Sequence, residues 1–216
     1  MSLDYSEDTL IQEGTATILE RLGWESIYAY DQEVLGQPGT LGRNTYKDVF
    51  LRQRFRKALR RINPWINEDQ LAEACDAMTS HSATQTLMQT NEQKYRLIRD
   101  GIDVTDIKPN GTKGTRRAQV IDFNNPENND FLAVRELWVY GQIYHRRADV
   151  VGFVNGLPLV FMELKNHDVA IDDAYNNNYS DYLDVIPQLF WYNAFVILSN
   201  GDEARVGTVG SKWEFF

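Results

Sequence analysis

Two acids and a lysine stand inside apolar, strand-like sequence between residues 148 and 166. Asp149 opens one β-branched and aromatic run, and Glu163 and Lys165 close the next. Because an isolated charge in apolar surroundings is strongly disfavoured unless it is paired or binds a metal, both acids need a partner. Two such carboxylates, with the Leu164 carbonyl as a third hard oxygen ligand, predict a Mg²⁺ site. Lys165 would orient a water molecule or stabilise a phosphate. The two acids and this lysine together form the arrangement that a magnesium-dependent phosphodiesterase needs.

The turn between the two runs decides whether the acids meet. Asn155-Gly156 is the strongest short-range signal for a β-hairpin, and alternate residues of a strand face the same side. A two-residue turn would set Asp149 opposite Met162, on the face away from Glu163. A three-residue turn, with Gly156 as a left-handed bulge residue, would pair Asp149 with Phe161 and bring the acids together. We predict that bulged turn, or an equivalent bulge nearer Asp149.

The rest of the chain predicts an α/β fold with a mixed sheet flanked by helices and a helical amino-terminal portion. Apolar spacing predicts helices over residues 6–22, 47–62, 67–78 and 169–183, with Asn67 as an N-cap. Strands are predicted over residues 120–123, 131–140, 194–199 and 204–209, the last at a sheet edge. Glycines and prolines predict loops over residues 28–45 and 108–117.

The ordered motifs resemble a known nuclease family. Asp149, followed by Glu163-Leu164-Lys165, is similar to the PD-(D/E)xK signature. Its surroundings, residues 123–131, 147–151, 154–159, 186–194, 199–201 and 213–216, resemble the amino-terminal nuclease region of the restriction (R) subunit of type I restriction-modification enzymes. The resemblance is specific from about residue 120 onward, and Ala148 stands where the family usually has proline. It implies a single restriction-endonuclease-like domain over 1–216, mainly helical over 1–118, with the catalytic core at 119–216.

The resemblance also implies further site residues. Family members carry a Gln-x-x-x-Tyr pair on the following helix, which corresponds here to Asn178 and Tyr182 as substrate-orienting residues. Some nucleases of this fold place an extra acid near the metal from the first helix. Glu13 is the candidate for that ligand, and a solvated glutamate is the alternative.

Cofactors and partners follow from the same resemblance. It implies Mg²⁺, with Mn²⁺ as a substitute, double-stranded DNA as substrate, and modification and specificity subunits as partners. An ATP-driven translocase would follow in a longer chain. No G-x-x-x-x-G-K-[ST] motif is present here, so ATP is expected only in the full-length subunit. Two other hypotheses remain: a stand-alone repair or recombination nuclease, and a non-catalytic DNA-binding or docking module whose site is vestigial.

Two groups of basic residues are candidates for DNA contacts. Arg52, Arg56 and Arg60 recur four apart on a predicted helix. They predict either a surface that binds DNA phosphates or an acidic neighbour domain, or simply a solvated helix face, and the sequence favours neither. The predicted loop at 108–117 could close over a phosphate backbone or be an exposed turn kept soluble by its charges. Its candidate residues are Lys113, Arg116 and Arg117.

Composition excludes several classes of protein. The 216 residues carry a net charge of −9, which argues against bulk electrostatic binding of nucleic acid but not against a nuclease whose acids bind metal. The single cysteine, Cys75, excludes an intramolecular disulfide and favours a reducing cytoplasm. No apolar run is long enough to span a bilayer. The three histidines and Cys75 lack the spacing of a zinc motif.

Overall fold

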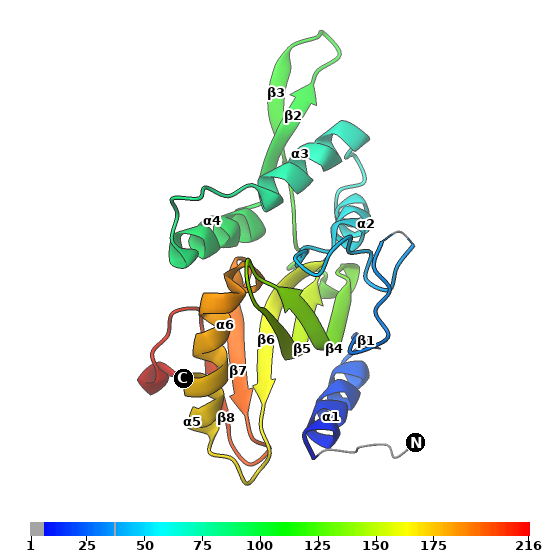
Figure 1. Ribbon diagram of the computed structural model, residues 1–216. Helices are drawn as coiled ribbons and strands as arrows, with labels where there is room; N and C mark the ends of the chain where they lie inside the picture. The colour runs from blue at the N-terminus through cyan, green and yellow to red at the C-terminus, as the bar shows by residue number, and fades with distance from the viewer. Residues whose placement is uncertain (1–6, 37) are drawn as a thin grey trace.

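The computed structural model describes residues 7–36 and 38–216, and its centre is a six-stranded mixed sheet (Figure 1). The strand order is β1-β4-β5-β6-β7-β8, with β1/β4 and β6/β7 parallel and the other neighbours antiparallel. The strands are β1 (Glu25–Tyr28), β4 (Phe131–Tyr140), β5 (His145–Val154), β6 (Leu157–Leu164), β7 (Phe195–Ser199) and β8 (Ala204–Gly207). The predicted restriction-endonuclease-like mixed α/β fold is therefore confirmed.

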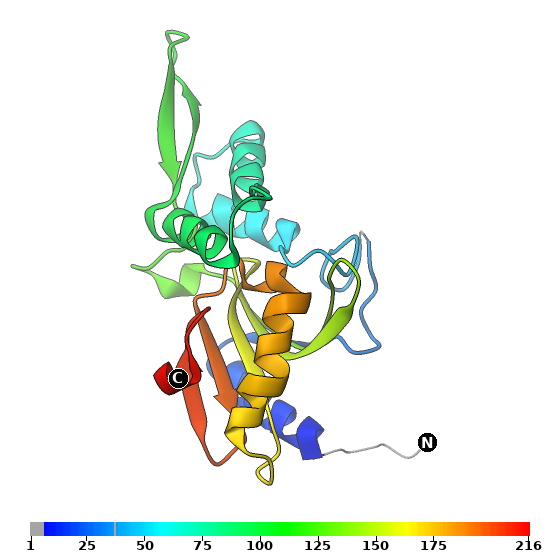
Figure 2. The same cartoon turned by 60° about the vertical axis from the view of Figure 1, so that its left-hand side comes forward.

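Helices lie on the sheet and at one of its ends. Those against the sheet are α1 (Glu7–Arg21) and the continuous segment of α5 (Ile171–Asp173), the π-helix η2 (Ala174–Tyr179) and α6 (Ser180–Val185). Beyond one end of the sheet lie α2 (Arg52–Ile62), α3 (Glu68–Thr79) and α4 (Leu87–Asp100), followed by a hairpin of β2 (Ile102–Ile107) and β3 (Lys113–Ala118) that projects away from the sheet (Figures 1 and 2). Short 3-10 turns are η1 (Pro126–Asn128), η3 (Pro187–Phe190) and η4 (Trp213–Phe215). Among the helices of residues 7–36 and 38–216, none combines the length and the apolar composition that a membrane span requires.

Several sequence predictions are confirmed. The first helix covers Glu7–Arg21, and the predicted residue 6 lies outside the described residues. Asn67 caps α3: its side chain accepts from the Gln70 backbone N–H at 2.9 Å, and the Gln70 side chain accepts from the Asn67 backbone N–H at 3.0 Å. Such a reciprocal cap satisfies two backbone donors at the helix start. The predicted strands at 131–140, 194–199 and 204–209 correspond to β4, β7 and the edge strand β8.

Other predictions are wrong for identifiable reasons. The loop predicted over 108–117 is correct for residues 108–112, but its second half is strand, because Lys113–Ala118 pairs with β2 along its whole length. No strand forms over 120–123, where the Asp122 backbone N–H donates to the Asn129 side chain instead of a neighbouring strand. The helix predicted from residue 47 begins only at Arg52, since the Asp48 carboxylate accepts the N–H groups of Asn44 and Thr45 and so stabilises a turn.

The β5–β6 turn has two residues and not the predicted three. The predicted alternative, a bulge nearer Asp149, is confirmed. Val154 pairs with Leu157 across a two-residue turn, in which both Asn155 and Gly156 have positive φ. A register shift between Gly152 and Phe153 then leaves an extra residue in β6. The bulge therefore lies nearer Asp149 than the turn does.

That register decides how the acids pair. Val150 pairs with Met162, so the next position sets Asp149 opposite Glu163 rather than opposite Phe161, as predicted for the bulged turn. Residues directly opposite in an antiparallel pair point to the same face of a sheet. The two acids are therefore cross-strand neighbours.

Candidate active site

Asp149, Glu163 and Lys165 line one cleft of about 840 Å³. Asp149 comes from β5, Glu163 from β6, and Lys165 from the residue directly after β6. Side chains from α1, η2 and α6 complete the walls, among them Gln12 and Tyr182. The structure thus brings together the three residues that carried the sequence prediction.

Hydrogen bonds hold these acids unequally. The Leu164 backbone N–H donates to Asp149 Oδ2 at 2.8 Å, and Lys165 Nζ lies 2.8 Å from Glu163 Oε1. Glu163 is only 1% exposed, and its other oxygen, Oε2, has no hydrogen-bond partner. A buried carboxylate oxygen without a donor is costly, so this atom marks a place where a cation or donor from outside the chain would be stabilised.

Burial raises the pKa of both acids. Desolvation is the largest cause for each, and it raises the pKa of Asp149 to about 6 and that of Glu163 to about 8. The Asp149 charge raises the pKa of Glu163 further, whereas Lys165 lowers it. Each carboxylate is therefore poorly compensated by the protein alone, which is the electrostatic condition of a cation site.

The donor set fits a hard divalent cation. Lys165 N–H donates to Ser199 O on the β7 side, while Leu164 N–H faces Asp149 on the β5 side. Since the N–H and C=O of one strand residue point the same way, the Leu164 carbonyl is also directed toward Asp149. Within residues 7–36 and 38–216, no three His, Cys, Asp or Glu side chains gather as a metal cage. Mg²⁺ nevertheless suits such a site, because it commonly uses one or two carboxylates together with waters and substrate phosphates.

Asn178 and Tyr182 lie in the same cleft. Asn178 belongs to the π-helix, where the Ser180 backbone N–H bonds to the Tyr175 carbonyl five residues earlier. The Tyr182 hydroxyl donates to the Arg147 carbonyl at 2.9 Å, and burial together with the Glu163 and Asp149 charges raises the Tyr182 pKa. The structure brings both residues of the implied pair to the acids.

Glu13 does not line this cleft: it is exposed on α1, and its neighbour Gln12 faces the cleft instead. Gln12 Nε2 donates to Glu136 Oε1 at 2.6 Å, and Glu136 forms an ion pair with Arg147. Sequence reasoning missed these three cleft residues. The adjacent charges Arg135 and Glu136 within an otherwise apolar strand were the one available signal, because strict alternation would place only one of them on the buried side.

Comparison with known proteins identifies the family. The sequence model for "Type I restriction enzyme R protein N terminus" matches residues 4–215. The chain belongs to this family. It is 33% identical over 210 residues to the type I restriction enzyme HindI endonuclease subunit of Haemophilus influenzae, covering 95% of this chain and 19% of that protein. It is 31% identical over 216 residues to the putative type I restriction enzyme MjaIXP endonuclease subunit of Methanocaldococcus jannaschii, covering 98% and 20% respectively.

The chain is also 25% identical over 189 residues to a type I restriction enzyme endonuclease subunit of Staphylococcus aureus, covering 85% of this chain and 19% of that protein. The chain thus spans about one fifth of the length of these curated relatives.

The arginines of α2 are largely engaged within the chain. Arg56 and Arg60 both form ion pairs with Glu68 of α3, and Arg54 bonds Glu25 at 2.7 Å. Arg52 is the loosest, 4.0 Å from an acid of α3. Intramolecular pairing therefore offsets much of the positive charge that the sequence placed on this helix.

The basic residues of the β2–β3 hairpin differ in their engagement. Arg117 bonds Asp103 across the hairpin at 2.8 Å, and the Arg116 guanidinium lies 3.9 Å from the centre of the Trp65 ring. Lys113 is exposed. The hairpin projects beyond the helices (Figure 1). None of Lys113, Arg116 and Arg117 lines the cleft of the acids.

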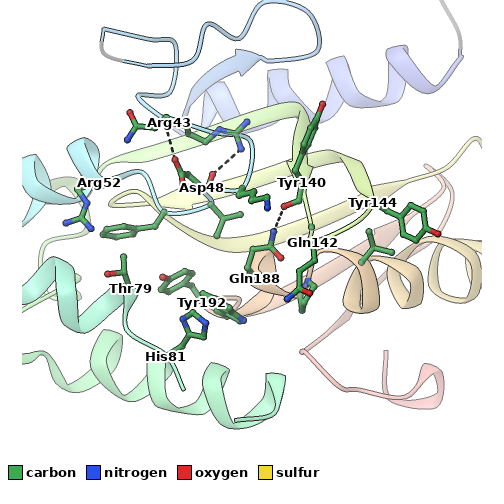
Figure 3. A pocket seen from close by; sticks show the side chains of 18 of the residues that line it. Arg43, Asp48, Arg52, Thr79, His81, Tyr140, Gln142, Tyr144, Gln188 and Tyr192 are labelled. Carbon is green, nitrogen blue, oxygen red and sulfur yellow. Dashed lines mark hydrogen bonds between the residues drawn. The ribbon is translucent and has the colours of Figure 1, made fainter. Parts of the chain in front are cut away.

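A second cleft, of about 1030 Å³, is lined in part by residues 141–144 of the β4–β5 connection (Figure 3). Arg52 and Tyr144 stand at opposite ends of the view, and aromatic side chains such as Tyr140 and Tyr192 lie between them. It is larger than the cleft of the acids but contains neither Asp149 nor Glu163. Cleft size alone therefore does not identify the candidate active site.

Proposed function

We propose that this domain hydrolyses DNA phosphodiester bonds with Mg²⁺, as the endonuclease domain of a type I restriction R subunit. The observation that carries the proposal is the buried Asp149–Glu163 pair, whose Glu163 Oε2 has no protein partner although it lies beside Lys165 in a cleft. The names of the relatives as endonuclease subunits support the same reaction. Mn²⁺ would substitute for Mg²⁺, because it also prefers oxygen ligands.

The residues have separate roles in this proposal. Asp149, Glu163 and the Leu164 carbonyl would hold the ion, which when bound offsets charge on a phosphate and makes a water molecule more acidic. Lys165, about one fifth exposed, can donate to a phosphate oxygen or to the attacking water while Glu163 fixes its position. Tyr182 is anchored to the Arg147 carbonyl and limits the volume beside the acids.

The wider setting is part of the proposal. Double-stranded DNA would be the substrate, and the domain would act in the cytoplasm with modification and specificity subunits. ATP would serve a motor elsewhere in a longer subunit, since the matched region is about one fifth of the relatives. Sequence recognition would then lie outside this domain.

The test is cleavage by the assembled enzyme, combined with calorimetric titration of the protein with Mg²⁺ or Mn²⁺. Asp149→Asn, Glu163→Gln and Lys165→Ala should each abolish cleavage with the fold intact, and the first two should also remove metal binding. Asp172→Asn, an exposed acid on α5, is the matched control and should retain both. A fully active Glu163→Gln enzyme would refute the proposal, and metal binding unaffected by Asp149→Asn would indicate a vestigial site.

A further inference from the structure

A third acid lies in line with the two proposed metal ligands. Arg135 pairs with Val150 and Leu137 with Ala148, so the unbroken register sets Glu136 opposite Asp149. The ladder is interrupted at this position, and Glu136 has a φ of 57°. Non-glycine residues seldom adopt this left-handed conformation, and strained backbone of this kind collects at functional sites. The strained backbone of Glu136, on β4, therefore indicates a functional role for this residue.

Glu136 is not placed to bind the metal, because both of its oxygens are engaged. Its Oε1 accepts from Gln12 at 2.6 Å, and its Oε2 faces Arg147 Nε in an ion pair. The residue is buried, at 7% exposure, whereas the Arg147 side chain is 39% exposed. The arrangement is thus a buried carboxylate that holds a partly exposed arginine in the wall of the cleft.

Arg147 is fixed in position but keeps N–H donors that Glu136 does not use. Its guanidinium carbon lies 4.8 Å from the centre of the Tyr30 ring and 5.7 Å from that of Trp138, which restricts its orientation. A guanidinium has five N–H donors in a rigid fork, and one carboxylate takes at most two of them. The remaining donors match the paired oxygens of a phosphate group.

The position of Arg147 relative to Asp149 indicates which ligand it would bind. Arg147 precedes Asp149 by two residues on β5, so both side chains are on one face of the sheet, about 7 Å apart along the strand. Both line the cleft that also contains Lys165. We propose that Arg147 is a phosphate-binding residue for the DNA strand being cut, and that Glu136 and Gln12 position its guanidinium. This inference rests on the proposed nuclease function.

The test measures phosphate neutralisation directly. The complete protein is titrated onto a short fluorescein-labelled DNA duplex by anisotropy at several salt concentrations, with Ca²⁺ in place of Mg²⁺. Arg147→Ala should weaken binding about tenfold to a hundredfold and lower the slope of log K against log salt by about 0.9, the value of one lost phosphate contact. Arg147→Lys keeps the charge but loses the fork, so it should keep the slope and bind less tightly.

Arg99→Ala is the matched control. Arg99 bonds Asp100 at 2.6 Å and lies 5.2 Å from the centre of the Tyr95 ring, but it is on α4 and does not line the cleft. It should leave affinity and slope unchanged. An Arg147→Ala slope equal to that of Arg99→Ala would overturn the inference.

Two further measurements distinguish a failure of this inference from a failure of the nuclease proposal. Glu136→Gln should keep the salt slope yet lower kcat, because glutamine cannot hold Arg147 as an ion pair; a wild-type rate would overturn the positioning role. Metal titration of Arg147→Ala should still show binding, because Asp149 and Glu163 are intact. If wild type neither binds a divalent ion nor cuts DNA, the nuclease proposal fails, whereas an unchanged salt slope in an active, metal-binding Arg147→Ala protein defeats only this inference.

Discussion

The protonation of Glu163 gives a prediction that is independent of catalysis. Without metal, the pKa of this carboxyl is about 8, against an ordinary glutamate value of 4.5, chiefly because of desolvation. Between these two pH values the folded chain keeps a proton that the unfolded chain has released. The free energy of unfolding therefore falls as the pH rises through this interval, and it stops falling above the folded-state pKa. Glu163→Gln has no proton to release here and should lack this fall.

The magnitude follows from the interval that is sampled. From about pH 6 to the folded-state pKa of about 8 there are two units, which at about 1.36 kcal/mol per unit amount to about 3 kcal/mol. Glu163→Gln should gain about that much stability relative to wild type between about pH 6 and pH 9. Lys94 has its pKa lowered to about 8 by burial and gives the opposite pH dependence, but it does so in both chains and cancels.

Urea unfolding in EDTA at about pH 6 and about pH 9 measures this difference in the free energy of unfolding between wild type and Glu163→Gln. Parallel behaviour of wild type and Glu163→Gln would refute the reasoning, because it would mean that Glu163 is ionised at no cost in the folded chain. Asp172→Asn, at an exposed position, should show no such pH-dependent gain.

Two more predictions concern the metal and the turn. Because bound metal requires ionised carboxylates, Mn²⁺ should raise Tm more at about pH 8.5 than at about pH 6, and Glu163→Gln should remove this difference; a shift of equal size at both pH values would contradict it. Gly156→Ala should destabilise the fold by clearly more than Gly111→Ala in urea unfolding. Both glycines have positive φ, but a Cβ at Gly156 would lie 2.5 Å from the Leu51 carbonyl oxygen, whereas one at Gly111 meets nothing within 4 Å. The Gly111 change should cost only about 1–2 kcal/mol, and equal losses would show that the close approach is unimportant.

Sequence patterns predicted the common face of Asp149 and Glu163 but not their pairing. Alternation along a strand is strict, so only registers that put both acids on one side could make a metal site. The bulge, however, occurs within β6 and not in the turn. Asn155 explains this: its buried side chain accepts from the Asp130 N–H at 2.8 Å and donates to the Val120 carbonyl at 2.8 Å. These long-range bonds stabilise the tight two-residue turn, and local sequence gives no sign of them.

Glu136 and the first strand were missed for a similar reason. Glu25–Tyr28 is a four-residue strand whose parallel pairing with β4 spans more than a hundred residues of sequence. Glu136 has a backbone conformation that strand periodicity does not anticipate. Its role depends on Gln12, which approaches from α1. Contacts between segments so distant in sequence follow from the sheet order, which periodicity alone does not provide.

Glu136, Asp149 and Glu163 differ in how many carboxylate oxygens remain free for a ligand, and that difference supports the proposed position of the metal. Glu136 has a partner on each oxygen, Asp149 accepts one backbone N–H, and Glu163 keeps one buried oxygen without any partner. Unsatisfied acceptor capacity is therefore greater on Asp149 of β5 and Glu163 of β6 than on Glu136 of β4. A cation is stabilised most where this capacity is greatest and a second carboxylate is adjacent, which is between Asp149 and Glu163. Arg147, on the Glu136 side, would then lie beside the proposed ion position rather than in it, where a guanidinium can bind phosphate without competing for the metal.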